Sequence, residues 1–267
     1  MSERRVALVT GAARGIGAET ACLLAQQGLR VVALDSCAGD ERGRSGVDYA
    51  LASRDDLRTT RERLGDRGIS VEADVRDAAA MEAASAAALD RWGRLDVAVA
   101  AAAVIAGGRP LWEEPSLDTL LEVDVVGVWN TATAVVPAML AGPDPSGCRF
   151  VAVASTAGTR GLFHLAAYNA AKHAVIGLVR GLAADLVGTG VTASAVSPGA
   201  TDTAMLEATA RLYGVPRDDL SVSRLQRGPL DPREIAATIA FACSREGRVL
   251  NGSVVSADGG AAGGAAG

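Results

Sequence analysis

Short apolar runs of strand length recur along the chain and alternate with segments of helical spacing. Within each run the apolar residues are nearly continuous, which is typical of strands covered on both faces. In the first segment of helical spacing, Ala21, Leu24 and Ala25 share a face, and Gly28 follows as a terminator. The predicted strands are residues 6–9, 31–34, 69–73, 95–101, 150–154, 191–196 and 253–256. The predicted helices are residues 18–27, 81–92, 117–140, 166–186 and 232–243.

This alternation of strand and helix predicts the fold class. Strands that are joined through helices pair in parallel, and their crossovers are right-handed in nearly all cases. The sequence therefore predicts an α/β fold, a doubly wound parallel sheet of about seven strands with helices on both faces. No internal repeat and no linker interrupts residues 1–260, which we expect to form one domain.

Three segments do not fit the alternation. Residues 36–56 are polar and rich in Gly, Asp and Arg, and they form an insertion after the second predicted strand. Residues 200–230 are a long connection with a short helical pattern of their own. We expect them to form a lid over the substrate, because long loops in compact domains are more often functional than accidental. Residues 261–267 contain only Gly and Ala and are predicted to be a flexible tail.

Composition and charge argue against several classes of protein. The formal net charge is -5, so no excess of basic side chains is available to neutralise phosphates, and we expect no nucleic-acid partner. The longest apolar run, residues 97–106, is far shorter than a membrane span, and residues 1–5 show no cleavable signal pattern. We therefore expect a cytoplasmic protein without a membrane partner. The four cysteines are scattered and there are two histidines, so no metal site is predicted.

One feature of the composition points to chemistry. Of the 26 lysine and arginine residues, only Lys172 is a lysine. Arginine can replace lysine on a solvated surface, but it does not replace a compact ammonium whose pKa an enzyme can tune. A single lysine kept against this bias is a candidate catalytic residue, and chance is the alternative.

The first predicted strand runs into the glycine-rich sequence TGAARGIG, residues 10–17, and then into a helix. Glycines let the chain turn sharply and approach a pyrophosphate, whose charge is favoured at a helix N-terminus. Asp35, at the end of the second predicted strand, is placed to accept hydrogen bonds from an adenosine ribose and to repel a 2′-phosphate, which favours NAD over NADP. A purely structural turn and a solvated carboxylate are the alternatives. The candidate cofactor-binding residues here are Gly11, Arg14, Gly15, Ile16, Gly17 and Asp35.

A second group of candidate residues lies in residues 155–172. Tyr168 and Lys172 are four residues apart in a predicted helix, which puts the phenol and the ammonium on one face. A phenol has a pKa of about 10, so it acts as a base at neutral pH only if a cation such as Lys172 stabilises its phenolate. Ser155 directly follows a predicted strand, and in an open parallel sheet ligands bind beyond the carboxyl ends of the strands. We therefore expect these three residues to converge at the cofactor, with ordinary core packing as the alternative.

With these residues in place, the chain resembles the short-chain dehydrogenase/reductase family over nearly its whole length. The resemblance implies a Rossmann-type fold that binds NAD. Residues 10–17 look like the cofactor loop of the family, and Ser155, Tyr168 and Lys172 match its catalytic serine, tyrosine and lysine. The remaining matches are Asp74 and Val75 to the adenine-contacting pair, Pro198, Gly199, Thr201 and Thr203 to the nicotinamide-side turn, and residues 258–260 to the C-terminal signature.

Two positions depart from the pattern of the family. The usual Asn-Asn-Ala-Gly after the fourth strand is replaced by alanines at residues 100–103, of which Ala101 is a candidate cofactor contact. Loss of the glycine weakens the expected close approach of this strand to the cofactor. The catalytic asparagine of the family aligns with Asp124. In the family its main-chain carbonyl is implicated in holding a water next to the lysine. A carbonyl contact survives the change to Asp, so Asp124 remains a candidate catalytic residue.

A narrower resemblance is to the mycofactocin-coupled branch of the family. It rests on the insertion (residues 36–40 and 47–52) and on residues 161–168 and 196–206. The resemblance implies that NAD stays bound and that mycofactocin, a redox carrier derived from a peptide, reoxidises it in place. A loop beside the adenosine half could cover the cofactor and slow its escape, and a tolerated surface insertion is the alternative.

These observations predict an NAD-dependent oxidoreductase that interconverts a small apolar alcohol and its ketone or other carbonyl by hydride transfer. Tyr168 takes the hydroxyl proton, Ser155 orients that oxygen, and Lys172 holds the ribose and stabilises the phenolate. An ordinary enzyme of the family with exchangeable NAD(H) and a catalytically inactive NAD-binding scaffold stay open as alternatives. The resemblance also implies a homotetramer. The predicted walls of the substrate pocket are Val104, Ile105, Phe163, Met205, Leu206, Leu212 and Tyr213.

Overall fold

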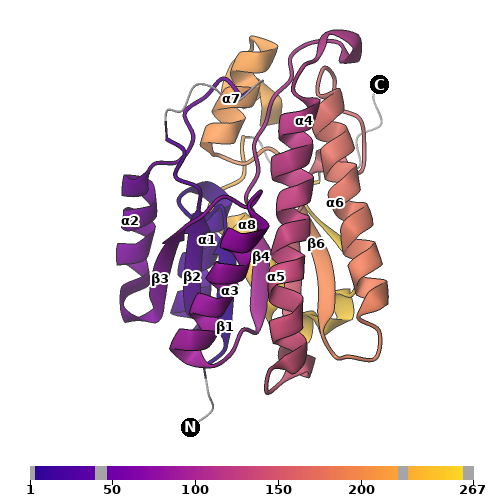
Figure 1. Ribbon diagram of the computed structural model, residues 1–267. Helices are drawn as coiled ribbons and strands as arrows, with labels where there is room; N and C mark the ends of the chain where they lie inside the picture. The colour runs from indigo at the N-terminus through magenta and orange to yellow at the C-terminus, as the bar shows by residue number, and fades with distance from the viewer. Residues whose placement is uncertain (1–3, 40–46, 222–227, 261–267) are drawn as a thin grey trace.

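The computed structural model describes residues 4–39, 47–221 and 228–260, and within them it places seven parallel strands in one sheet (Figure 1). The strands are β1 (Val6–Thr10), β2 (Arg30–Asp35), β3 (Gly68–Glu72), β4 (Val97–Ala100), β5 (Arg149–Val153), β6 (Thr192–Pro198) and β7 (Val254–Ala257). Their order in the sheet is β3-β2-β1-β4-β5-β6-β7. The strand order therefore reverses between β1 and β4, and a reversal of this kind opens a crevice at the carboxyl ends of the two strands.

Every predicted apolar run overlaps one of these strands, and the register brings the candidate residues to one edge of the sheet. Thr10, the last residue of β1, pairs with Leu34 on one side and Ala100 on the other. All six strand pairings are parallel. The carboxyl ends of the strands thus lie together, at the upper end of the sheet in Figure 1. The predicted α/β fold class is confirmed.

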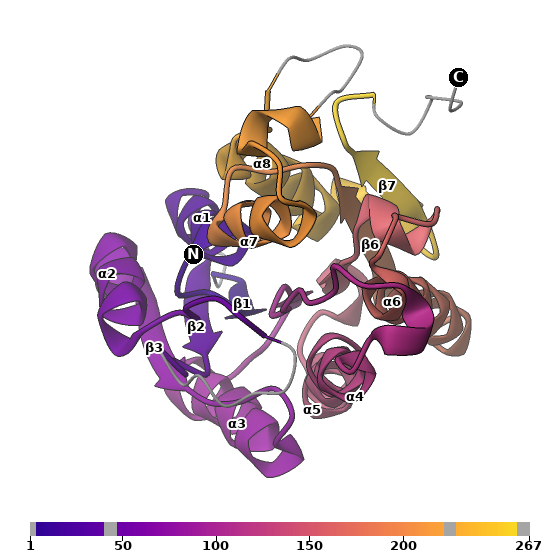
Figure 2. The same cartoon turned by 90° about the horizontal axis from the view of Figure 1, so that it is seen from above.

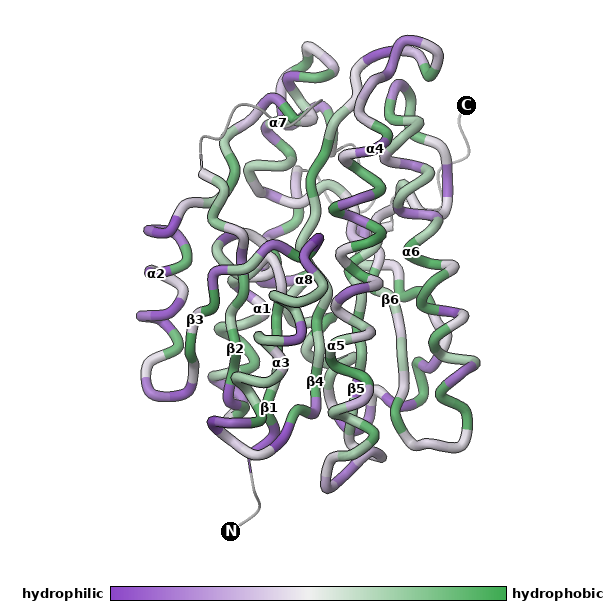
Figure 3. The backbone as a smooth tube through the Cα atoms, viewed as in Figure 1, coloured by the Kyte–Doolittle hydropathy of each residue, from purple (hydrophilic) through white to green (hydrophobic). Residues whose placement is uncertain are grey.

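Helices cover both faces of the sheet (Figure 2). On one face, α1 (Gly15–Gln26), α2 (Arg54–Leu64) and α8 (Pro232–Cys243) bury one apolar cluster with alternate side chains of the strands. On the other face, α3 (Ala78–Trp92), α5 (Gly127–Ala141) and α6 (Ala166–Asp185) bury a second cluster. Covering on both faces explains why the strands are apolar along their length, as Figure 3 shows.

The predicted helix 117–140 is present as one helical segment, but it is not α-helical throughout. The structure divides it into α4 (Leu117–Leu120), a π-helical segment (Leu121–Val126) and α5. Apolar spacing does not distinguish an α-helix from a short π-helical segment within it, so the helix was predicted but its π-helical segment was not. The π-helical segment carries Asp124, and π-helical bulges occur frequently at functional sites.

By length and composition alone, the continuous helical segment Leu117–Ala141 could span a membrane, with a mean hydropathy of 1.4 in its most apolar window. Half of that window is buried inside the protein, where α5 packs against α3, β4 and β5. A core helix passes the same test, so this feature is weak evidence for a membrane span.

The end of the predicted insertion 36–56 was placed wrongly. Residues 54–56 form the first turn of α2, and Ser53 caps that helix. The Ser53 hydroxyl accepts a hydrogen bond from the Asp56 N–H, and the Asp56 carboxylate accepts one from the Ser53 N–H, a reciprocal capping box. The Ser-x-x-Asp spacing carries this signal in the sequence. The insertion therefore ends before Ser53.

The predicted lid, residues 200–230, contains α7 (Ala204–Tyr213) and a 3₁₀ turn (Arg217–Ser221). A bridge between Thr201 and Leu230 closes the base of the lid. Residues 222–227 and the predicted tail 261–267 lie outside the described residues, and so do residues 40–46 of the insertion.

Candidate active site

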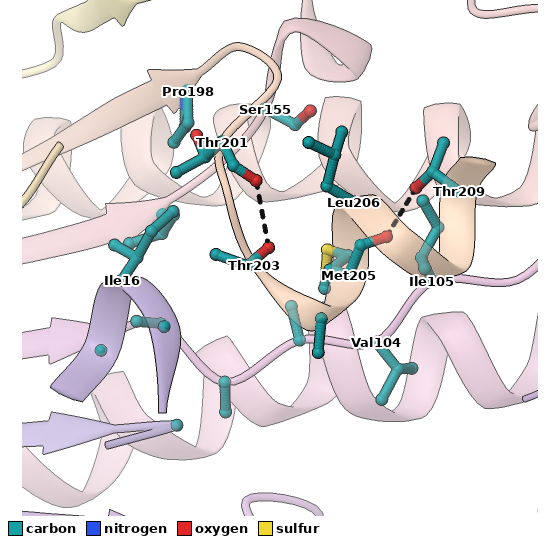
Figure 4. Close-up of a pocket in the computed structure, with 18 of the residues that line it drawn as sticks. Ile16, Val104, Ile105, Ser155, Pro198, Thr201, Thr203, Met205, Leu206 and Thr209 are labelled. Carbon is teal, nitrogen blue, oxygen red and sulfur yellow. Dashed lines mark hydrogen bonds between the residues drawn. The ribbon is translucent and has the colours of Figure 1, made fainter. Parts of the chain in front are cut away.

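A cavity of about 880 Å³ opens at the carboxyl ends of the strands, in the crevice between β1 and β4. Figure 4 shows that its lining comes from segments far apart in the sequence: Ile16 from α1, Val104 from the loop after β4, Ser155 from the loop after β5, and Thr201 and Met205 from the lid. The cavity therefore has the position that ligands occupy in open parallel sheets.

The glycine-rich loop forms one wall because its glycines permit close contacts. A Cβ atom on Gly11 would lie 2.7 Å from the Cα of Ala102, and one on Gly17 would lie 2.1 Å from the carbonyl oxygen of Gly11. Any larger residue at either position would push the loop away from β4 or from α1. Gly11 and Gly15 also have positive φ angles of 65° and 60°, which glycine adopts readily. The loop thus presents bare backbone to the cavity at the N-terminus of α1.

The loop after β4 keeps its close approach although it lacks the glycine of the family. The Thr10 hydroxyl accepts hydrogen bonds from the backbone N–H groups of Ala101 and Ala102, each at 3.1 Å. These two bonds tie the loop to the end of β1. Ala101, Ala102 and Ala103 all line the cavity.

Asp35 lines the cavity at the end of β2, and backbone groups hold its carboxylate in place. The backbone N–H groups of Ala13 and Cys37 donate to its two oxygens, each at 3.1 Å. Burial raises the pKa of Asp35, while these two hydrogen bonds and the charge of Arg14 act in the opposite direction. The carboxylate is therefore fixed where the predicted adenosine ribose would lie.

Asp74 and Val75 also line the cavity, next to β3. The Arg76 guanidinium binds the Asp74 carboxylate at 2.6 Å, so Asp74 is paired within the chain. The Asn130 side-chain amide donates to the carbonyl of Val75 at 2.9 Å and fixes the backbone of this turn. A Cβ on Gly127 would lie 2.5 Å from Val75, so the start of α5 packs directly on the turn.

Ser155 and Tyr168 meet in the cavity, as predicted. Ser155 is the second residue after β5, and its hydroxyl accepts a hydrogen bond from the Ala157 N–H at 3.2 Å. Tyr168 is 6% exposed, and its hydroxyl lies 3.9 Å from the sulfur of Met205. Burial raises the pKa of Tyr168, and Asp124 raises it further, while the Lys172 ammonium and a hydrogen bond with Ser155 lower it.

Lys172 is buried beside Tyr168, one helical turn further along α6. Its Nζ lies 3.2 Å from Oδ2 of Asp124, donates to the carbonyl of Val153 at 3.3 Å and lies 5.5 Å from the centre of the Tyr168 ring. Burial lowers the pKa of Lys172, but the negative charge of Asp124 and the interaction with Tyr168 outweigh burial and raise it overall. Lys172 therefore stays an ammonium, which the predicted chemistry requires.

The contact between the Asp124 carboxylate and Lys172 was not predicted from the sequence. The resemblance to the family pointed only to the main-chain carbonyl of Asp124. Neither the spacing nor the composition indicates that the two side chains meet, since they come from different helices.

The nicotinamide-side turn lies at the end of β6, where Pro198, Gly199, Thr201 and Thr203 line the cavity. The Thr201 hydroxyl donates to the carbonyl of Gly199 at 3.0 Å. The Thr203 hydroxyl donates to the carbonyl of Thr201 at 3.3 Å, the bond drawn between these two residues in Figure 4. A Cβ on Gly15 would lie 3.3 Å from the Thr203 side chain, so this turn faces the glycine-rich loop across the cavity.

The predicted substrate walls are correct in part. Val104, Ile105, Met205, Leu206 and Tyr213 line the cavity. Phe163 and Leu212 are not among the lining residues. Phe163 is 73% exposed and stacks on the ring of His164, which turns it away from the cavity. Apolar lining residues that the sequence analysis did not name include Leu162 and Leu165.

The described part of the insertion crosses the mouth of the cavity. We call residues 47–52 the strap. The Arg14 side chain of the glycine-rich loop donates to the carbonyl of Ala50 at 2.6 Å, and the Ile105 N–H donates to the Tyr49 hydroxyl at 3.3 Å. The backbone N–H of Leu51 donates to the carbonyl of Gly39. The strap is therefore bonded both to the cofactor loop and to the substrate side of the cavity.

Within the described residues, no group of three or more His, Cys, Asp or Glu side chains could hold a metal ion.

Comparison with known proteins agrees with this geometry. A family model of short-chain dehydrogenases, described as Enoyl-(Acyl carrier protein) reductase, matches residues 11–262. The chain is 35% identical over 269 residues to an uncharacterized NAD-dependent oxidoreductase of Mycobacterium tuberculosis, which covers 96% of this chain and 95% of the relative. It is 32% identical over 276 residues to the (-)-trans-carveol dehydrogenase of Rhodococcus erythropolis, with 97% of each protein covered.

A solved structure of a similar protein has the same fold over nearly the whole chain. The crystal structure of carveol dehydrogenase from Mycobacterium avium in complex with NAD superposes with a TM-score of 0.88 at 30% identity, covering 96% of this chain and 97% of that one. The family model and the two relatives each match nearly the whole chain. The chain belongs to the short-chain dehydrogenase/reductase family.

Proposed function

We propose that the protein is an NAD-dependent oxidoreductase that interconverts an apolar alcohol and its carbonyl by hydride transfer. One observation carries the proposal: Ser155, Tyr168 and Lys172 meet in the same cavity as the glycine-rich loop and Asp35. The first group can move a proton, and the second can hold a dinucleotide beside it. Inactive scaffolds have no need for a buried ammonium next to a buried phenol.

The residues of the cavity fit NAD. Its volume of about 880 Å³ is in the upper range of small-molecule sites. Bare backbone at the N-terminus of α1 favours a pyrophosphate, and Asp35 accepts from ribose hydroxyls while it disfavours a 2′-phosphate. When bound, the nicotinamide supplies the hydride acceptor or donor. The residues that would hold the cofactor are Gly11, Arg14, Gly15, Ile16, Gly17, Asp35, Asp74, Val75, Ala101, Tyr168, Lys172, Pro198, Gly199, Thr201 and Thr203.

Tyr168 acts as the base in the oxidative direction. Its hydroxyl points at the lid side of the cavity and contacts the Met205 sulfur at 3.9 Å, so Met205 has to move aside before a substrate oxygen can take that place. Ser155 orients that oxygen through its hydroxyl. Lys172 stabilises the phenolate form of Tyr168 by its charge. Two of the three N–H donors of Lys172 face Asp124 and Val153 within the described chain, which leaves the third for a ribose hydroxyl.

The substrate is an apolar alcohol or its ketone. The apolar side chains of Val104, Ile105, Leu162, Met205 and Leu206 line the substrate half of the cavity and offer dispersion contacts to a substrate. Similarity to carveol dehydrogenases agrees with this lining. We propose a cyclic terpenoid-like alcohol as the first substrate to try, with carveol as the probe.

We further propose that NAD is held tightly and that mycofactocin reoxidises it in place. Support comes from the strap, which is bonded to Arg14 on one side and to Ile105 on the other. A dinucleotide in the cavity would have to displace these contacts to leave by the adenosine side. Each 1.4 kcal/mol that the strap adds to the bound state slows release roughly tenfold, if the exit transition state gains nothing.

The cytoplasmic location and the homotetramer remain proposals. Exposed apolar side chains on the outer side of the π-helical segment and α5 favour an oligomer, since Val126 is 42% and Trp129 60% exposed. Light scattering at several protein concentrations tests this proposal. Elution as a monomer at all concentrations would contradict it.

One experiment separates the tightly held cofactor from the exchangeable one. Purified protein is denatured and the released NAD is measured. Turnover of carveol is then compared with free NAD and with an artificial electron acceptor. We expect bound NAD, slow turnover with NAD alone and faster turnover with the acceptor. Protein that is free of cofactor and turns over freely with added NAD would support the exchangeable alternative.

A variant without the strap completes this test. Because Gly39 and Leu51 are joined by a backbone hydrogen bond, deletion of residues 40–50 can be closed at that point without moving β2 or α2. The deletion should make NAD exchangeable while the alcohol is still oxidised. Inertness of the intact protein towards a broad panel of alcohols, with NAD bound, would instead support the scaffold.

A further inference from the structure

Asp124 has no exposed surface and is not among the residues that line the cavity, although its neighbours Val104 and Lys172 are. It belongs to the π-helical segment Leu121–Val126, beside α6. Its Oδ1 accepts a hydrogen bond from the Val104 N–H at 2.9 Å, and its Oδ2 lies 3.2 Å from the Nζ of Lys172. One carboxylate thus connects the loop that lines the substrate pocket to the lysine beside Tyr168.

Both neighbours of this carboxylate are donors. Val104 offers a backbone N–H and Lys172 offers an ammonium, and they occupy different oxygens of Asp124. An aspartate is a pure acceptor and satisfies both. An asparagine has one oxygen and an NH₂ group, so in the same orientation it would face one of the two donors with a donor. A carboxylate therefore serves both donors, whereas an asparagine in the same orientation serves one of them.

We propose that the Asp124 carboxylate is a positioning residue that holds the Lys172 ammonium and, through it, sets the pH range in which Tyr168 can accept a proton. This inference rests on the proposed role of Tyr168 as the base. Asp124 does not touch the substrate or cofactor in this account; it acts on Tyr168 through Lys172 and through its own charge.

The charged and titratable groups around Tyr168 come from several elements. Lys172 lies on α6 beside it, Asp124 on the π-helical segment, Ser155 after β5, and Tyr49 on the strap. Lys172 favours the phenolate, whereas Asp124 disfavours it and raises the pKa of Tyr168. The charge of Asp124 also raises the pKa of Tyr49, for which burial is the larger cause. Arg14 faces Tyr49 from the glycine-rich loop and lowers it.

The net charge of Asp124, Lys172 and Tyr168 changes when Tyr168 loses its proton. With Tyr168 as phenol, the Asp124 and Lys172 charges cancel, so this buried wall is neutral. Forming the phenolate leaves one net negative charge, which is favourable only when a positive charge is added to the cavity, as oxidised nicotinamide adds it. The charge of Asp124 thus makes deprotonation of the Tyr168 phenol depend on the presence of the oxidised cofactor. Without the carboxylate, Lys172 alone would stabilise the phenolate at lower pH.

The sign of the expected shift follows. Tyr168 must be deprotonated to accept the alcohol proton, so the rate of oxidation rises with pH through its pKa. Asp124→Asn removes a nearby negative charge and lowers that pKa, so the acid limb of kcat/KM should move to lower pH by about one unit. In the same variant the buried Lys172 loses its counter-charge, which lowers the pKa of its ammonium. Lys172 then loses its proton at lower pH, so the alkaline limb of kcat/KM should also move to lower pH.

The test compares Asp124→Asn with a matched control. Asp96 is also buried, accepts from a backbone N–H (Val6, 2.8 Å) and pairs with a cation (Arg94, 2.6 Å), but it lies at the amino ends of the strands. We expect Asp96→Asn to lower stability without moving either limb of the pH profile. If Asp124→Asn changed the rate equally at all pH values, as a merely structural residue would, the inference would be overturned.

A titration that needs no turnover separates this inference from the proposed function. Tyrosinate absorbance is followed against pH in the presence of NAD, and the signal of Tyr168 is isolated by subtracting the Tyr168→Phe variant. The midpoint should be lower in Asp124→Asn than in the wild type. Such a shift in a protein that oxidises no alcohol would refute the proposed function and leave the electrostatic coupling standing. An unchanged midpoint in an active enzyme would refute the coupling alone.

A second pair of variants covers the case in which Asp124→Asn does not fold. Lys172→Met leaves the Asp124 carboxylate buried without its cation, which is strongly unfavourable. The double variant Lys172→Met/Asp124→Asn should therefore melt at a higher temperature than Lys172→Met alone. A double variant that is less stable than Lys172→Met would show that Asp124 does not serve Lys172, and would overturn the inference.

Discussion

The two ends of the sheet bury the same kind of ion pair and use it differently. At the amino ends, Asp96 accepts from the Val6 N–H and binds the Arg94 guanidinium at 2.6 Å. At the carboxyl ends, Asp124 accepts from the Val104 N–H and faces Lys172 at 3.2 Å. Arg94 presents a rigid fork to both oxygens of Asp96. Lys172 is a compact ammonium that Asp124, Val153 and Tyr168 share.

The comparison indicates that buried polar groups at the amino ends of the strands stabilise the fold, whereas those at the carboxyl ends serve the reaction. Near the amino ends, Arg149 donates to four backbone carbonyls in the loops that flank β5 and α8, and these bonds close the end of the sheet. At the carboxyl ends, Ser155, Tyr168 and Lys172 line a cavity of about 880 Å³ and keep polar atoms turned towards it. Substitutions at the two ends should therefore separate loss of stability from loss of activity.

The largest expected effect is that of Tyr168→Phe on activity. The ring still packs between the cavity and the core, but no phenolate remains to accept the proton. We expect alcohol oxidation to fall by about 1,000-fold, within the range for loss of a general base, while the melting temperature and NAD binding stay near those of the wild type. Steady-state rates and thermal unfolding check both parts. Turnover close to that of the wild type would exclude Tyr168 as the base.

The second effect is a loss of stability without a loss of activity, and it concerns Asp96 at the amino ends of the strands. Asp96→Asn removes the carboxylate charge that binds the buried Arg94 guanidinium, and breaking a buried ion pair costs about 3–5 kcal/mol. We expect the free energy of unfolding in urea to fall by about that amount, with kcat unchanged in the protein that remains folded. A fall in kcat at unchanged stability would show that the two ends of the sheet are not separable in this way.

The third effect concerns Asp35 and the choice between NAD and NADP. Asp35→Ser removes a carboxylate that would face a 2′-phosphate, and close like charges cost several kcal/mol. The ratio of the two dissociation constants should narrow by roughly 100-fold or more, since 1.4 kcal/mol is tenfold. Isothermal titration of the variant with each cofactor measures this. An unchanged preference would place the discriminating group elsewhere.

The smallest expected effect is that of the Tyr49 hydroxyl, on the strap, on the rate of NAD release. Tyr49→Phe removes one hydrogen bond with Ile105 and keeps the ring, so NAD release should become a few-fold faster, in line with about 1 kcal/mol for the bond. Tyr213→Phe is the matched control, because its hydroxyl donates instead to the carbonyl of Phe163 next to the lid. The control should alter KM for the alcohol and leave NAD release unchanged. If both variants changed the rate of NAD release equally, the strap would have no distinct role in holding NAD.

Much of this architecture could be predicted because it depends on local patterns. Continuous apolar runs located all seven strands, and Gly28 located the end of α1, since it closes that helix with a φ of 98°. The end of the insertion was misplaced because the capping pair Ser53 and Asp56 was read as loop, although its spacing was visible.

Other features could not be predicted because they depend on contacts between distant elements. The π-helical segment has the same apolar spacing as an α-helix, and the bond between Asp124 and Lys172 exists only once that segment packs against α6. Phe163 was expected in the pocket for its size and apolar character, yet it stacks on His164 outside. Side-chain direction in an irregular loop has no sequence period that would reveal it.

The central claim is that the carboxyl ends of this sheet carry out alcohol oxidation with NAD. The most direct measurement mixes the wild-type protein, loaded with NAD, with carveol and follows the absorbance of reduced nicotinamide in a single turnover. The account predicts a rise in absorbance whose amplitude equals the concentration of bound NAD, and no rise in Tyr168→Phe loaded to the same extent. A wild-type protein that binds NAD but gives no reduced nicotinamide with carveol or with any alcohol of a broad apolar panel would contradict it.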